Sequence, residues 1–172
     1  MPSNRLTAAF RLLKGTATFQ AQEESVSIVV CSTSTDGGAF CGGIFLPPDV
    51  DPSRPIRVYT RAFSVSSIPT GPGDVLFQVG ASGSMPDGTL INRVFSFIWT
   101  VPDPFTTGMT QELLLDDGSG VTIPGGELSP GDYLAFSLTR LGADAADTYI
   151  RPVGVAPVLA VEYSKRCQFC CC

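Results

Sequence analysis

Apolar and polar side chains alternate along most of this chain, which predicts β-strands rather than helices. In residues 56–63 (IRVYTRAF), every second side chain is apolar or small, and the side chains between them are arginine or aromatic. Clusters of Gly, Pro, Asp and Ser separate such segments and predict turns. Strands are expected at residues 25–31, 40–46, 56–63, 75–80, 93–101, 110–115, 133–140 and 153–163, with a shorter segment at 121–123.

Eight or nine short strands with turn residues between them are typical of an antiparallel β-sandwich, and this number suits a jelly-roll arrangement. The alternation predicts that each sheet has one covered face. We therefore expect an all-β sandwich at residues 24–163, preceded by an arm (1–23) and followed by a tail (164–172).

The first residues show a different spacing. Leu6, Phe10 and Leu13 are separated by four and three positions, and Gly15 follows, which predicts a short amphipathic helix over residues 6–14. These three apolar side chains would either grip a neighbouring subunit or pack against their own domain. Arg11 interrupts the apolar segment, so we do not expect a secretion signal.

Composition excludes several classes of function. The chain has 172 residues, a net charge of −5 and no histidine. Nucleic acid is not expected as a partner, because phosphate binding needs a basic face. The lack of histidine excludes His-dependent catalytic triads and His-ligated metals. No apolar segment is long enough to span a membrane, and the low charged fraction of 16% suits a surface that packs against other subunits.

Six cysteines are the most unusual feature of the sequence. They are Cys31, Cys41, Cys167, Cys170, Cys171 and Cys172. The terminal CQFCCC is a poor zinc site within one chain, because adjacent side chains diverge. A disulfide staple is favoured, ahead of buried thiols and ahead of a metal shared between chains; the staple would join several chains, or join the tail to Cys31 or Cys41. These two cysteines would otherwise pair with each other across one hairpin.

The acidic residues do not suggest an enzyme. Asp116, Asp117, Asp132, Asp144 and Asp147 lie in turn segments. Aspartate is common there because its side chain accepts hydrogen bonds from nearby backbone amides, and this explanation is favoured over a calcium site. Glu23, Glu24 and Glu112 form no recognisable pair for glycoside cleavage. We therefore expect a protein without catalytic residues, cofactor or metal.

One predicted strand carries candidate contact residues on a single face. Arg57, Tyr59, Arg61 and Phe63 alternate with small and apolar positions. Aromatic and arginine side chains are the usual anchors of protein interfaces. A subunit interface is the favoured interpretation, a saccharide-binding strip is the alternative, and a strand buried on both faces is the third.

Several segments resemble jelly-roll domains of tailed-phage virion proteins. They are 44–56 (IFLPPDVDPSRPI), 122–140 (TIPGGELSPGDYLAFSLTR), 144–149 (DAADTY), 153–155 (VGV) and 161–163 (VEY), which together extend over about residues 24–163. The resemblance implies a structural virion protein of β-sandwich fold, in a family whose members are usually trimers. It brings no catalytic residues, and the cysteine tail departs from its pattern.

These observations predict a structural protein made in the host cytoplasm and incorporated into a phage virion. It would be a trimeric capsid decoration or head-surface spike that stabilises the particle through contacts with its own copies and other virion proteins. The alternative is a receptor-binding module of a tail or fibre, which contacts a host surface glycan through loops such as 83–88 and 142–148.

Overall fold

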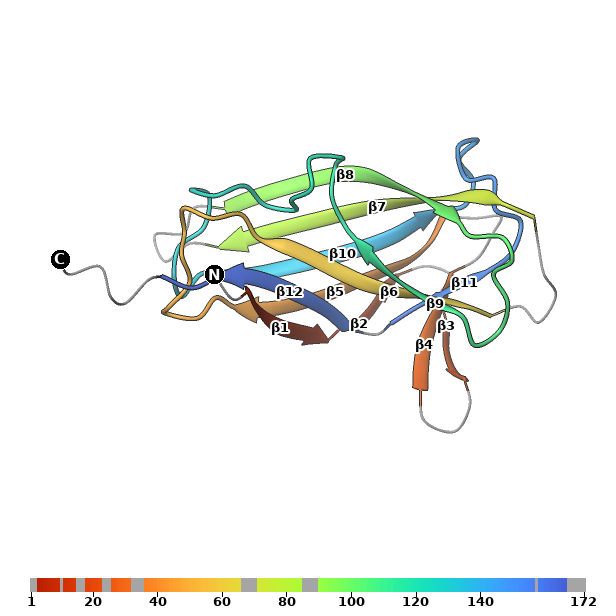
Figure 1. Cartoon of the computed structure of the whole chain (residues 1–172), viewed down its shortest axis with the longest axis horizontal. Helices are drawn as coiled ribbons and strands as arrows, with labels where there is room; N and C mark the ends of the chain where they lie inside the picture. Colours follow the sequence, from red (N-terminus) through yellow and green to blue (C-terminus); the bar gives the residue numbers. More distant parts are fainter. Residues whose placement is uncertain are drawn as a thin grey trace.

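The computed structural model describes residues 3–9, 11–14, 18–22, 26–31, 36–65, 71–84, 90–156 and 158–166. These segments form two antiparallel β-sheets packed face to face (Figure 1). The predicted antiparallel β-sandwich is therefore confirmed. None of the described segments contains a helix long and apolar enough to cross a bilayer.

The first sheet, called sheet A below, has seven strands within the described residues. They are β1 (Ser3–Ala9), β3 (Thr18–Gln22), β4 (Val26–Cys31), β6 (Arg57–Ser64), β9 (Thr110–Leu114), β11 (Val153–Val155) and β12 (Val158–Ser164). β6 pairs with β9 along one edge and with both β11 and β12 along the other. β1 then continues the sheet beyond β12, and β4 with β3 continues it beyond β11.

The second sheet, called sheet B, has the strand order β2-β5-β10-β7-β8. Its strands are β2 (Arg11–Lys14), β5 (Asp36–Phe45), β7 (Gly73–Ser84), β8 (Leu90–Val101) and β10 (Tyr133–Leu141). β10 is central and pairs in antiparallel register with β5 and β7, and β8 forms one edge.

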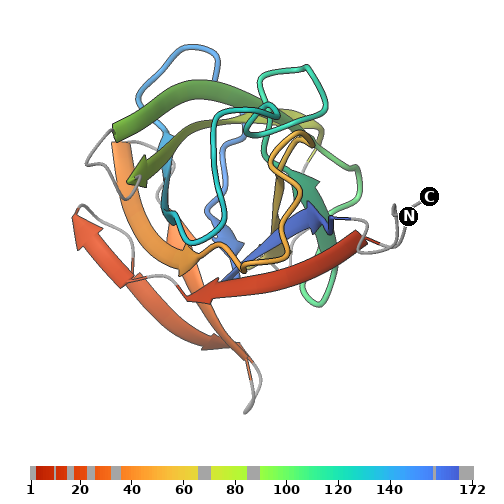
Figure 2. The same ribbon diagram turned by 90° about the vertical axis from the view of Figure 1, so that its left-hand side faces the viewer.

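The order of strands in the two sheets is that of a jelly roll. β4, the β11–β12 pair, β6 and β9 lie side by side in sheet A, and they face β5, β10, β7 and β8 in sheet B. The chain crosses between the sheets repeatedly, as this double Greek-key arrangement requires. Figure 2 shows the two layers from the end of the sandwich.

The core fills the space between the sheets. Along β6 and β10 every second side chain is buried, which is the alternation that the sequence predicted. Phe77, Phe105 and Phe136 are among the largest fully buried side chains. Trp99 of β8 also belongs to the core and meets Phe105 edge-on, with ring centroids 5.4 Å apart.

The predicted N-terminal helix over residues 6–14 is wrong. β1 pairs with β12, where Leu6 lies opposite Val161, and β2 pairs with β5 in the other sheet. A nine-residue helix is marginally stable by itself, so pairing with two existing sheet edges prevails over local helical spacing. Leu6 packs against the sandwich core. Phe10 and the side chain of Leu13 lie outside what the structure describes.

Two further details differ from the prediction. The single strand expected at 153–163 is divided into β11 and β12, and the amide of Ala156 donates to the carbonyl of Arg61 at the break (2.8 Å). Cys31 and Cys41 do not flank a hairpin, because β4 and β5 belong to different sheets. The side chains of these two cysteines and the whole of residues 167–172 lie outside the described residues, so the disulfide staple stays a prediction.

Candidate functional site

The outer face of sheet B combines exposed aromatic, apolar and small polar side chains. Its described members, called the sheet B face below, come from four strands: Asp36, Gly43, Phe45, Asp74, Leu76, Gln78, Gly80, Ser82, Ser84, Leu90, Asn92, Val94, Ser96, Ile98, Thr100, Tyr133, Ala135, Ser137, Thr139 and Leu141. Among them the charged residues are Asp36 and Asp74, which lie at the end away from Tyr133. The larger part of this face is therefore uncharged among the described side chains, which do not include those of the edge strand β2.

An aromatic pair occupies one end of the sheet B face. Tyr133 lies directly on Gly43, where an added Cβ would come within 1.9 Å of the Tyr133 hydroxyl oxygen and 2.3 Å of Cζ. Only glycine allows the ring this position. Tyr133 is 40% exposed, so the ring covers the backbone on one side and meets solvent on the other. Phe45, 71% exposed, lies beside it with ring centroids 5.1 Å apart and ring planes tilted by 59°.

Polar side chains continue the face from the aromatic pair. Ser84 lies directly opposite Tyr133, and Ser82 follows on the same face of β7. The Ser82 hydroxyl donates to Oδ1 of Asn92 on β8 (3.3 Å). Hydroxyl and amide groups both donate and accept hydrogen bonds. This end of the face therefore offers aromatic surface and uncharged hydrogen-bonding groups together.

An apolar row runs along the β8 edge of the same face. Leu90, Val94 and Ile98 point outward from β8 at intervals of four residues and are between 54% and 75% exposed. Contiguous exposed apolar surface marks contact sites, and here Asn92 and Ser96 separate the three apolar side chains along the strand.

The strip predicted on residues 57–63 faces outward from sheet A. Arg57 and Arg61 are exposed, and Tyr59 and Phe63 are partly buried, so the prediction that all four share one face is confirmed. The interpretation of this strip as a subunit interface stays a prediction, because the structure describes one chain.

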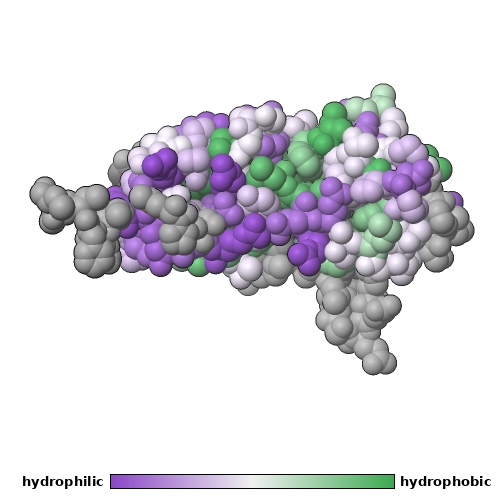
Figure 3. Space-filling model, in the orientation of Figure 1, coloured by the Kyte–Doolittle hydropathy of each residue, from purple (hydrophilic) through white to green (hydrophobic). Residues whose placement is uncertain are grey.

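The structure adds an ion-pair network to this strip that the sequence did not reveal. Arg5 of β1 lies over the Tyr59 ring, 4.5 Å from its centroid, and contacts Glu112 of β9 at 3.0 Å. Glu162 of β12 contacts Arg5 and Arg57, both at 3.4 Å. The hydrogen bonds with Glu112 raise the pKa of Arg5 above its ordinary value. Figure 3 shows this side of the molecule, where a hydrophilic band crosses the surface.

A hollow of about 260 Å³ lies beside this network. Its lining residues are Thr7, Tyr59, Thr60, Arg61, Glu112, Ala156 and Ala160. They come from β1, β6, β9 and β12 and from the break between β11 and β12. We call this feature the Tyr59 hollow. The sequence did not reveal it, because its lining residues meet only through the pairing of distant strands.

The aspartates have the structural roles that turn chemistry predicts. Asp116 and Asp117 accept hydrogen bonds from the amides of Gly118 and Ser119, and Asp144 accepts one from Ala146. Among the described residues no group of three or more His, Cys, Asp or Glu side chains could hold a metal ion.

The other two predicted aspartates are buried in the sandwich. Asp147 forms an ion pair with Arg140, and Oδ2 of Asp132 accepts from the amide of Ser129 (2.7 Å). These contacts account for Asp147 and for Oδ2 of Asp132, while Oδ1 of Asp132 is buried and has no hydrogen-bond partner among the described residues. Glu23 and Glu24 lie outside the described residues.

Comparison with known proteins gave structural matches but no sequence match. No family model and no curated protein matches this chain. The CBM22-1 xylan-binding domain of Paenibacillus barcinonensis Xyn10C superposes with a TM-score of 0.49 at 8% identity, over 94% of this chain and 95% of that one. An isomalto-dextranase of Arthrobacter globiformis gives 0.49 at 13% identity, over 92% of this chain and 23% of that one.

A phage protein is also among the matches. The enzymatically active domain of tailspike protein 4 from bacteriophage CBA120 gives a TM-score of 0.39 at 12% identity, over 92% of this chain and 19% of that one. All these scores are too low to carry a conclusion about function. The jelly-roll assignment therefore rests on the strand order of this chain itself.

Proposed function

We propose that this protein is a non-catalytic saccharide-recognising module that binds a neutral oligosaccharide on the sheet B face. The observation that carries the proposal is the Tyr133 ring, which lies directly on Gly43 at the end of the face where no described side chain is charged. Sugar rings have apolar C–H faces that pack on aromatic rings, and Tyr133 and Phe45 provide two such surfaces at an angle.

The polar groups of the face match the remaining needs of such a ligand. Ser82, Ser84 and Asn92 lie next to the aromatic pair and are exposed. They would exchange hydrogen bonds with sugar hydroxyls, each of which is both donor and acceptor. An open face accommodates several sugar units in a row, and the lack of charged side chains among the described residues around the aromatic pair favours a neutral ligand.

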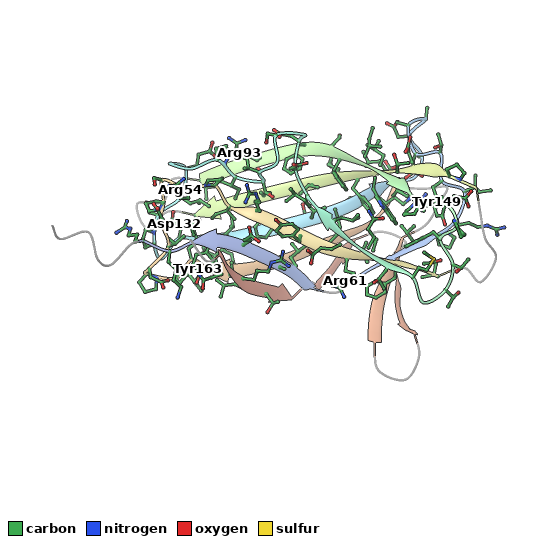
Figure 4. All side chains as sticks on the ribbon, viewed as in Figure 1. Arg54, Arg61, Arg93, Asp132, Tyr149 and Tyr163 are labelled. Carbon is green, nitrogen blue, oxygen red and sulfur yellow. The ribbon has the colours of Figure 1, made fainter. Side chains whose placement is uncertain are left out.

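Substitution of Tyr133 by alanine tests this function. We expect the Kd for a neutral hexasaccharide to rise about ten-fold or more, because the stacking surface is lost. Binding of cellohexaose, xylohexaose and maltohexaose would be measured by isothermal titration calorimetry. Ile150→Ala is the matched control, because Ile150 is also exposed but follows Tyr149, which Figure 4 places far along the molecule from Asp132, the neighbour of Tyr133. Equal affinities for wild type and Tyr133→Ala would contradict the proposal.

A second candidate function is that of a structural subunit, and the apolar row on β8 favours it. The occupant would be a second copy of this chain, packed against Leu90, Val94 and Ile98. Each copy carries a net charge of −5, and contact through uncharged side chains avoids bringing the negative charges of the two copies together. The resemblance of residues 24–163 to tailed-phage virion proteins supports a place on a virion for either function. A trimer in native mass measurements supports the second candidate, and a monomer at every concentration contradicts it.

A further inference from the structure

The Tyr59 hollow lies on the opposite side of the sandwich from the sheet B face and has a different chemistry. It is lined by charged and hydroxyl side chains as well as by the partly buried Tyr59. Its volume of about 260 Å³ lies below the roughly 300–1,000 Å³ of sites for drug-sized ligands. The hollow therefore suits one small ligand unit rather than a chain lying across it.

The charges around the hollow do not balance. Three guanidinium groups, those of Arg5, Arg57 and Arg61, face two carboxylates. Glu112 is engaged by Arg5, and Glu162 is shared between Arg5 and Arg57. The side chain of Arg61 is exposed and has no ion pair or hydrogen bond with any described residue. Among the described residues, one guanidinium at the rim of the hollow thus has no ion-pair partner, and Glu112, its cross-strand neighbour, is engaged by Arg5.

The other walls of the hollow provide apolar and hydrogen-bonding surface. Ala156 and Ala160 are small and leave the space open beside Tyr59. Thr7 and Glu112 are exposed and can exchange hydrogen bonds with hydroxyl groups. Thr60 also lines the hollow, but it is 3% exposed and belongs to the inward-facing positions of β6.

We propose that the Tyr59 hollow binds a sugar acid, a ligand in which one carboxylate stands beside several hydroxyl groups. The Arg61 guanidinium receives the carboxylate, since paired N–H groups match its two oxygens. Glu112 and Thr7 hydrogen-bond to the hydroxyls, and the apolar face of the ring lies against Tyr59 and the two alanines. This site goes beyond the proposed function, because it is on the other sheet and selects an anionic ligand.

The test compares three probes that separate these contributions. D-galacturonate has the carboxylate and the hydroxyls, D-galactose has only the hydroxyls, and acetate has only the carboxylate. Each would be titrated into the isotope-labelled protein and followed by NMR chemical shifts. We expect D-galacturonate to bind about ten-fold or more tightly than either of the other two, with shifts at Tyr59, Arg61 and Ala160.

Arg61→Gln is expected to weaken D-galacturonate binding about ten-fold, and Arg61→Lys is expected to retain part of it. Arg54→Gln is the matched control, because Arg54 is also exposed but lies near the end of the molecule where Asp132 is found (Figure 4). Tyr133→Ala should leave D-galacturonate binding unchanged, so a failure here is distinct from a failure of the proposed function. D-galactose binding as tightly as D-galacturonate, the absence of D-galacturonate binding, or an Arg61→Gln variant with wild-type affinity would overturn the proposal.

Discussion

Replacing Asp147 by alanine is expected to lower the free energy of unfolding by about 3–5 kcal/mol, because it leaves a buried guanidinium without its counter-ion. Arg140 and Asp147 both have fully buried side chains. Nη2 of Arg140 lies 2.5 Å from Oδ1 of Asp147, and Nε donates to Oδ2 at 2.8 Å. The pair is therefore bidentate and shielded from water.

The remaining contacts of this pair explain its importance for the fold. Arg140 also donates to the carbonyls of Arg151 (2.8 Å) and Tyr149 (2.6 Å), and Asp147 accepts from the amide of Leu76 (3.1 Å). The ion pair and its hydrogen bonds thus connect the loop that follows β10 to β10 itself and to β7. None of these groups has an alternative partner in water once they are buried, so the cost of losing one partner is high.

Urea denaturation followed by Trp99 fluorescence would measure this effect. Asp144→Ala is the matched control in the same loop, because Asp144 is exposed and accepts one local hydrogen bond; its loss should cost about 1 kcal/mol or less. The double variant Arg140→Met, Asp147→Leu should recover part of the stability, because it removes the buried charge altogether. If Asp147→Ala lowered the free energy of unfolding no more than Asp144→Ala does, the stabilising role of the buried ion pair would be contradicted.

The second large effect is expected for Trp99→Ala, which should cost about 3–5 kcal/mol through the cavity it creates. Trp99 is 4% exposed, and its indole Nε1 donates to Oε1 of Gln111 at 3.0 Å. Because Trp99 belongs to β8 in sheet B and Gln111 to β9 in sheet A, the indole joins the two layers. The variant also loses the edge-on contact with Phe105.

The neighbouring residue provides a matched control for this prediction. Ile98 points to the opposite face of β8 and is mostly exposed, so Ile98→Ala should change stability by less than about 1 kcal/mol. Circular dichroism during urea denaturation would compare the two variants, since one of them lacks the tryptophan. A similar loss of unfolding free energy in both variants would mean that β8 is displaced by one residue from its register with β7.

The sequence predicted those parts of the fold that depend on local patterns. Alternation in 57–63 and 133–140 identified strands whose inner and outer faces the structure confirms. The helix predicted for the N-terminal segment is wrong, because the spacing of three apolar residues does not by itself distinguish a helix from strands. The pairing with β12 and β5 decides between them, and those strands lie far away in the sequence. The division near residue 157 had a signal in Pro157, which has no N–H for a sheet ladder.

The candidate sites were harder to predict, because their residues meet only through pairing of distant strands. The alternation identified Tyr59 and Arg61 as outward-facing but could not bring Glu112 or Arg5 to them. Tyr133 showed no special feature, since its exposed position depends on Gly43 of β5 lying directly beneath its ring. Outward aromatic residues in a strand that pairs with a glycine-rich strand are the signal that could have revealed it.

The proposed recognition of a neutral saccharide by the sheet B face can be tested on the wild-type protein. The most direct measurement is an NMR titration of the isotope-labelled wild-type protein with cellohexaose, xylohexaose and maltohexaose, with the shifted amides mapped onto the structure. We expect saturable shifts for at least one of these ligands, concentrated at Gly43, Ser82, Ser84, Asn92 and Tyr133. Shifts confined to sheet A, or no shifts with any of the three at millimolar concentration, would contradict it.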